Sequence, residues 1–178
     1  MSVEYRLGYI VGIAVAIAIT AVLVVLIGKF ANKNGRIKTE YDERQNIVRG
    51  KGYMIGFWTL VIYICLIGVS YDLGLNIPAG MGIMCFIGMI IAITVHCSYC
   101  IWNGAYWGLN NNIKRFMIVI VIGGAINWFI AILSIIEGRM LVDGMVKGSF
   151  INLMVGVMLL VILIVIALRK MADKKEEE

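Results

Sequence analysis

Five long apolar stretches, separated by short polar segments, dominate the pattern of this chain. They cover residues 7–28, 53–70, 81–102, 116–136 and 150–168, and none of them contains Asp, Glu, Lys or Arg. An α-helix rises about 1.5 Å per residue, so each stretch is long enough to cross a hydrocarbon core of roughly 30 Å. Strands of a membrane barrel are shorter and alternate in polarity, which these stretches do not. The pattern predicts an all-α integral membrane bundle of five transmembrane helices.

The overall composition agrees with this pattern. Of the 178 residues, 61% are hydrophobic and 15% are charged, and the mean hydropathy is +0.92. A soluble domain carries roughly a quarter charged residues. The chain has one proline and no long polar tract, so we expect a single transmembrane domain over residues 1–178. The first apolar stretch exceeds the length of a signal-peptide core and is expected to remain as a true span.

The distribution of positive charge predicts the orientation of the protein. Segments 29–52, 103–115 and the tail from residue 169 hold thirteen of the sixteen Lys and Arg residues. Cytoplasmic loops of membrane proteins carry this excess, so the N-terminus is predicted outside and the C-terminus in the cytoplasm. The net charge of +5 is thereby explained without a nucleic-acid partner. The expected location is the cell membrane, as a multi-pass protein in the lipid bilayer.

The segment 29–52 alone holds seven Lys and Arg residues. A short interfacial helix is predicted within 40–52, where Asp42 is suited to cap the helix and Glu40 stands four residues before Arg44, in the order that favours an ion pair. This helix is either a connector on the membrane surface or a docking surface for another protein. The candidate docking residues are Tyr41, Asp42, Glu43, Arg44, Gln45, Arg49 and Lys51.

Small residues recur at helical spacing in the first three apolar stretches. In the first, Gly8, Gly12 and Ala16 are four residues apart, which is typical of a face that packs closely against another helix. Small and polar side chains, among them Gly56 and Gly88, also line one face of the second and of the third stretch. The fifth stretch is almost purely aliphatic and is expected to have the largest contact with lipid.

Polar side chains inside the apolar stretches form a second group of candidates. They are expected to face other helices, because a polar group in lipid is left without a partner. We expect His96 to hydrogen-bond to Thr59 or Tyr63, and Asn127 to hydrogen-bond across helices. The candidate intramembrane polar cluster comprises Thr59, Tyr63, His96, Tyr99 and Asn127.

The sequence His96-Cys97-Ser98-Tyr99-Cys100 also suggests a metal or thiol site, because His and a C-x-x-C pair supply ligands of the right type. Tetrahedral zinc sites usually have a second pair of ligands, however, and cytoplasmic cysteines are normally reduced. Free cysteines are also ordinary packing residues in helices. A packed histidine is therefore the preferred interpretation, and no metal or cofactor is predicted.

The segment after the third apolar stretch is rich in aromatic and asparagine residues. Trp102, Tyr106 and Trp107 are predicted to form an aromatic belt at the level of the lipid headgroups. Asn110 to Asn112 are predicted to form the turn between an interfacial helix and the fourth span.

Two motifs in these loops resemble a known group of proteins. Tyr41-Asp42-Glu43-Arg44-Gln45 is followed by Arg49-Gly50-Lys51-Gly52, and Ala105-Tyr106-Trp107-Gly108-Leu109-Asn110 precedes Lys114-Arg115. Together they resemble small multi-pass membrane proteins of unknown function from Gram-positive bacteria. The resemblance implies a membrane location and suggests that the two inner loops belong to one cytoplasmic face.

The function classes can be narrowed by what the chain lacks. The sequence contains no phosphate-binding loop, no serine nucleophile motif, no metalloprotease helix and no acidic metal cluster. The leading hypothesis is a non-enzymatic accessory, regulatory or immunity-type protein that contacts a membrane or cytoplasmic protein at its inner face. The alternative is a small transporter or channel, which would require a homo-oligomer because five spans make a thin bundle.

Overall fold

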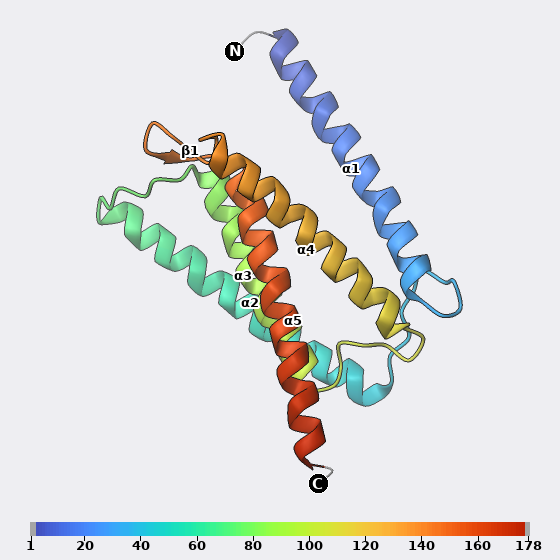
Figure 1. Ribbon diagram of the computed structural model, residues 1–178. Helices are drawn as coiled ribbons and strands as arrows, with labels where there is room; N and C mark the ends of the chain where they lie inside the picture. Colours follow the sequence, from blue (N-terminus) through green and yellow to red (C-terminus); the bar gives the residue numbers. More distant parts are fainter. Residues whose placement is uncertain (1–2, 177–178) are drawn as a thin grey trace.

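The protein was analysed as a computed structural model that describes residues 3–176. Five helices in it are long and apolar enough to cross a membrane, which confirms the predicted all-α fold of a multi-pass membrane protein. The helices are α1 (Val3–Ala31), α2 (Glu43–Asp72), α3 (Met81–Trp102), α4 (Ile113–Ile136) and α5 (Phe150–Glu176). The two ends of the chain lie at opposite ends of the molecule (Figure 1).

The predicted short interfacial helix within 40–52 is wrong as a separate element. Its residues form the first turns of α2, which runs without a break for 30 residues. Asp42 caps this helix as expected: its side chain accepts a hydrogen bond from the Gln45 amide at 2.6 Å, and the Gln45 side chain accepts one from the Asp42 amide at 3.3 Å. This reciprocal capping box satisfies two amides at the start of a helix, so α2 begins about three turns before its apolar part.

The helices lie side by side in the order α2, α3, α5, α4, with α1 beside α4 (Figure 1). The core lies where α3, α4 and α5 meet, around the buried side chains of Ile101, Ile120 and Ile162. The prediction that the fifth span has the largest lipid contact is wrong, because α5 packs against two neighbours. The helix with the largest surface open to lipid is α1, whose side chains are exposed along its apolar length.

The small residues of α1 do not form a packing face within this chain. Alanine-sized side chains at Gly8 and Gly12 would meet no atom within 4 Å. The matching faces of α2 and α3, in contrast, do pack together. A Cβ atom at Gly56 would lie 3.2 Å from the carbonyl oxygen of Ala92, and one at Gly88 would lie 2.5 Å from the ring of Tyr63. Small residues therefore set the distance between α2 and α3.

A small β-hairpin joins α4 and α5 at one end of the bundle. Its strands are β1 (Leu141–Val142) and β2 (Met145–Val146). Asp143 and Gly144 at its tip both have positive φ, as a tight hairpin turn requires. The amide of Val146 donates to the carbonyl of Pro78 at 2.7 Å, which ties the hairpin to the connection 73–80. We call this end of the molecule the hairpin end.

The orientation in the membrane remains a prediction, and labelling of single cysteines tests it. In a variant whose four native cysteines are replaced, a cysteine at Lys33 is expected to react with a membrane-impermeant maleimide only after the cells are permeabilised. A cysteine at Lys147, at the hairpin end, is expected to react in intact cells. The opposite pattern would show that the charge bias had been assigned to the wrong side.

Candidate docking face formed by two interlocked loops

Two loops that are far apart in the sequence interlock at the end of the bundle opposite the hairpin. They cover residues 32–42 and 103–112, and we call them together the loop platform. Backbone hydrogen bonds join them along their length: the Lys33 amide donates to the Asn110 carbonyl at 2.8 Å, and the Leu109 amide donates to the Glu40 carbonyl at 2.8 Å. These bonds satisfy polar groups that loops normally leave to water.

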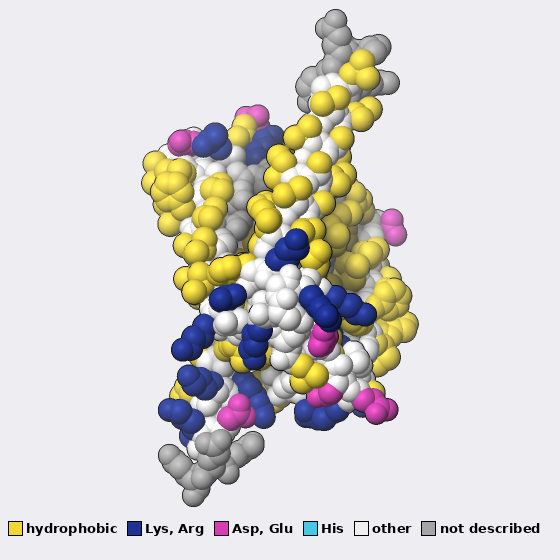
Figure 2. Space-filling view, turned by 90° about the vertical axis from the view of Figure 1, so that its right-hand side faces the viewer, with side chains coloured by type: hydrophobic (Ala, Val, Ile, Leu, Met, Phe, Trp, Pro, Cys, Tyr) yellow, Lys and Arg dark blue, Asp and Glu magenta, His cyan; other side chains and the backbone are white. Residues whose placement is uncertain are grey.

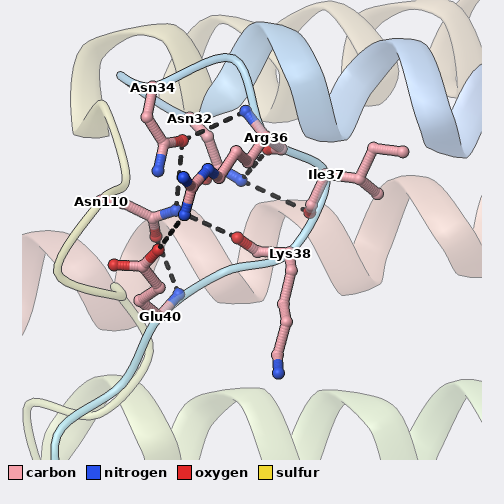
Figure 3. A network of polar contacts seen from close by, with 7 residues as sticks. All are labelled: Asn32, Asn34, Arg36, Ile37, Lys38, Glu40 and Asn110. Atoms are coloured by element: carbon pink, nitrogen blue, oxygen red, sulfur yellow. Dashed lines mark hydrogen bonds and ion pairs between the residues drawn. The ribbon is translucent and has the colours of Figure 1, made fainter.

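Buried asparagine side chains complete this connection. Asn111 donates through Nδ2 to Oδ1 of Asn32 at 2.5 Å, and Asn32 donates to the Arg36 carbonyl at 2.6 Å. Asn110 accepts from the Glu40 amide at 2.9 Å and donates to the Lys38 carbonyl at 3.0 Å (Figure 3). Asn110 bonds to backbone groups of the facing loop, Asn32 bonds within its own loop, and the bond between Asn111 and Asn32 joins the two loops into one ordered unit.

The three consecutive asparagines have different roles. The predicted turn at Asn110–Asn112 is present, but the interfacial helix expected before it is absent: residues 103–112 form turns and irregular backbone. Asn112 caps α4 by accepting from the Arg115 amide at 3.2 Å. Asparagine accepts and donates through one short side chain, which suits it to both capping and loop pairing.

Close contact at Gly108 determines how tightly the loops approach. A Cβ atom at this position would lie 2.6 Å from the carbonyl oxygen of Glu40 and would also collide with the Thr39 side chain. The Gly108 amide donates to Oδ1 of Asn111 at 2.7 Å. Only a residue without a side chain fits between the loops here.

The start of α2 is hydrogen-bonded to the loop platform through Gln45, the partner of Asp42 in the capping box. Gln45 donates through Nε2 to the carbonyl of Trp107 at 3.0 Å and to that of Gly104 at 3.3 Å. The predicted ion pair between Glu40 and Arg44 is wrong. Glu40 precedes the helix and pairs with Arg36 at 3.6 Å, while Arg44 donates to the Asn103 carbonyl at 3.4 Å.

A stack of side chains leads from the loop platform into the apolar part of the bundle. The Arg49 guanidinium lies 4.0 Å from the centroid of the Tyr41 ring and donates to the hydroxyl of Tyr53 at 3.0 Å. The ring of Tyr53 in turn stacks on His96 with the centroids 4.3 Å apart. Burial raises the pKa of Tyr41 above its ordinary value, and the nearby Arg49 partly opposes this shift. Tyr41 is therefore a neutral phenol at physiological pH.

The predicted intramembrane polar cluster is brought together only in part. Tyr63 donates from α2 to the carbonyl of Met84 in α3 at 2.9 Å, and His96 faces α2. The expected partners of His96 were wrong, because it contacts Tyr53 and the Sγ of Cys100, at 3.8 Å. Thr59 and Asn127 were expected to bond across helices, but each donates to a carbonyl of its own helix: Thr59 to that of Ile55 and Asn127 to that of Gly123.

A polar side chain within an apolar helix can bond to the carbonyl four residues earlier, which removes the need for a neighbour. This explains the failed expectations at Thr59 and Asn127. Tyr99 is half-buried, and its backbone carbonyl accepts from the Asn103 side chain at 2.8 Å. Within residues 3–176, no group of three or more His, Cys, Asp or Glu side chains is arranged to hold a metal ion.

Two residues of the predicted aromatic belt, Tyr106 and Trp107, connect the loop platform to the hydrophobic core. The rings of Tyr106 and Trp107 lie edge to face, 4.8 Å apart, and Trp107 lies 5.2 Å from Phe116. Both side chains are half-buried and pack against the core, whereas Trp102 is exposed as expected for the membrane surface. Burial raises the pKa of Tyr106, so its phenol is neutral.

The seven candidate docking residues divide into two groups. Asp42, Gln45 and Arg49 hold the local structure through the contacts described above, with Tyr41 beneath the guanidinium. Glu43, Arg44 and Lys51 are exposed. Figure 2 shows Lys and Arg side chains gathered over the lower part of the molecule, with several Asp and Glu side chains among them. The result is an ordered polar face on which Glu43 and Lys51 carry exposed charges, while Arg44 also bonds to the Asn103 carbonyl.

No family model matches the chain, and neither the curated proteins nor the solved structures include one with significant similarity to it. The resemblance to small Gram-positive membrane proteins therefore remains a prediction from the two loop motifs.

Proposed function

We propose that this protein is a non-enzymatic accessory, regulatory or immunity-type membrane protein that binds another protein through the loop platform. The observation that supports this proposal is the interlocking of residues 32–42 with 103–112 by buried asparagines. A face that is ordered before binding loses little conformational entropy when a partner docks. A purely connecting loop has no need of such internal order.

The charges of the platform and of the adjoining first turns of α2 indicate the chemistry of the partner. Lys33, Lys38 and Lys51 are exposed and positively charged, and Glu43 is the exposed acid of the first turn of α2. We propose that the partner is a membrane or cytoplasmic protein that presents an acidic segment to this face. Complementary charge mainly raises the association rate and selects the partner. The local structure of this face is held by three positioning residues, Asp42, Gln45 and Arg49.

Charge reversal on the platform and on the adjoining first turns of α2 tests this function. The double variant Lys38→Glu/Lys51→Glu is expected to lose a stoichiometric partner that co-purifies with the wild-type protein from native membranes. The expected loss of affinity is about tenfold or more, and it decreases at high salt because exposed charges are screened. The matched control is Lys147→Glu at the hairpin end, which is expected to retain the partner. Equal retention by both variants would contradict the proposed face.

The alternative function is that of a small oligomeric transporter or channel. The feature that favours it is α1, which packs only lightly against α4 and exposes its apolar side chains. A second copy of the chain that packs against α1 would widen the bundle. A monodisperse homo-oligomer that lacks a partner and supports solute flux in liposomes would favour this alternative over the docking function.

A further inference from the structure

A groove lies between α2 and α3 near the hairpin end, away from the loop platform. Its cavity volume is about 410 Å³. It is lined by the second half of α2 and the first half of α3, including Tyr63, Gly68, Tyr71, Asp72, Met81 and Met84. Pockets of roughly 300–1,000 Å³ accommodate drug-sized organic molecules, so this groove is large enough for such a ligand.

The groove results from the uneven packing of α2 and α3. Near the loop platform, Gly52 and Gly56 let the two helices approach closely, with Cβ positions 2.9 Å from Cys100 Sγ and 3.2 Å from the Ala92 carbonyl. The helices separate toward the hairpin end (Figure 1). At Gly68 an added Cβ would meet nothing within 4 Å. The open space therefore begins near Leu60 and Tyr63, where the close contacts of the glycines end.

The walls of the groove are apolar and adaptable. Met81, Met84 and Met89 belong to one helix and all line the cavity. Unbranched thioether side chains change shape easily and accept ligands of different outlines. The rings of Tyr63 and Tyr71 add aromatic surface, which attracts cations that come to lie over its face. These walls suit a bulky apolar body better than a hydrated ion.

The charge of the groove is negative. Asp72 is its one charged lining residue, and it ends α2, where the helix dipole adds partial negative charge. The last turn of α2 contains no basic residue. Among the described side chains, the ion pairs within 4.0 Å do not include Asp72. Its carboxylate is therefore available to an outside cation.

We propose that this groove binds a lipophilic monovalent cation of about drug size. The apolar body lies among the methionines, and the positive charge lies near Asp72 at the end of α2. Close contacts with the groove walls provide most of the affinity, because apolar groups between membrane-spanning helices are held by packing. The carboxylate provides the preference for positive over neutral or negative ligands. This inference is independent of the proposed docking function, which depends on the opposite end of the molecule.

A pair of ions with the same shape and opposite charge tests the proposal. Binding of tetraphenylphosphonium and of tetraphenylborate is measured by equilibrium dialysis with the full-length protein in nonionic detergent, with empty micelles as the blank. Saturable binding of the phosphonium is expected, with an affinity at least tenfold above that of the borate. Equal affinities, or binding no greater than to empty micelles, would overturn the proposal.

Two variants identify the site of binding. Asp72→Asn is expected to weaken phosphonium binding about fivefold, in line with an exposed ion pair. The control Asp143→Asn, which removes a carboxylate from the hairpin outside the groove, is expected to change nothing. Gly68→Leu fills the open space and is expected to weaken binding more than tenfold, with the thermal unfolding midpoint retained. Unchanged binding in both Asp72→Asn and Gly68→Leu would place the cation elsewhere and overturn the proposal.

Discussion

Replacement of Gly108 by alanine is expected to separate the two loops of the platform. The added methyl group would lie 2.6 Å from the Glu40 carbonyl oxygen and would collide with Thr39. The obstructing carbonyl belongs to the backbone and cannot swing away like the end of a flexible side chain. Overpacking of a tight site costs about 1–3 kcal/mol. We place Gly108→Ala at the upper end of this range.

Amide hydrogen exchange of the protein in micelles measures this effect. The protection of residues 32–42 and 103–112 is expected to fall by about 10- to 100-fold, since 1.4 kcal/mol corresponds to a factor of ten. Protection in α3 and α5 is expected to stay the same. Gly50→Ala is the matched control, because nothing lies within 4 Å of its Cβ position in α2. Unchanged protection in Gly108→Ala would mean that the loops tolerate a wider separation.

Replacement of Asn111 by leucine is expected to have an effect of similar size for a different reason. The variant removes the donor to Asn32 Oδ1 and the acceptor of the Gly108 amide. Asn32 is 1% exposed and Asn111 is 5% exposed, so water has little access to the groups left behind. Each buried polar group without a partner costs about 1–3 kcal/mol. Two such groups are expected to open the platform locally.

A double-mutant cycle separates this pairing from a general loss of packing. Asn32→Leu and Asn111→Leu are compared singly and together by the same exchange measurement. Because the two side chains bond to each other, their effects are expected to be less than additive, with a coupling of about 0.5–3 kcal/mol. Asn76→Leu, at an exposed position of the connection 73–80, is the control. Strict additivity would show that the bond between Asn32 and Asn111 contributes nothing.

The apolar pattern alone was sufficient to predict the helices. The third span was placed at its observed ends, Met81 and Trp102, and α5 begins at the predicted residue 150. A backbone in lipid must satisfy its own hydrogen bonds, so a long apolar stretch has few other conformations available. The helix start at Asp42 was predicted, but the polar residues that follow it were assigned to a separate short helix instead of to the start of α2. Hydropathy does not reveal the Asp42–Gln45 capping box, although its residue spacing was visible in the sequence.

The candidate site was predicted less well than the fold. The sequence indicated that two polar loops share one face, and it singled out Asp42 as a cap. It did not reveal that Asn32, Asn110 and Asn111 are buried, because runs of asparagine are typical of exposed turns. The pairing of Arg36 with Glu40, instead of Glu40 with Arg44, depends on where α2 begins.

What the sequence determined by itself was the number of membrane helices, their approximate length and the grouping of positive charge between them. These properties depend on local composition and on the thickness of a bilayer. The tertiary structure decided the order in which the helices pack, the central place of α5, the isolation of α1 and the locking of the two loops. Such features depend on shape and on hydrogen-bond geometry between residues distant in the chain. The hydropathy of apolar helices with similar compositions does not show which of them pack together.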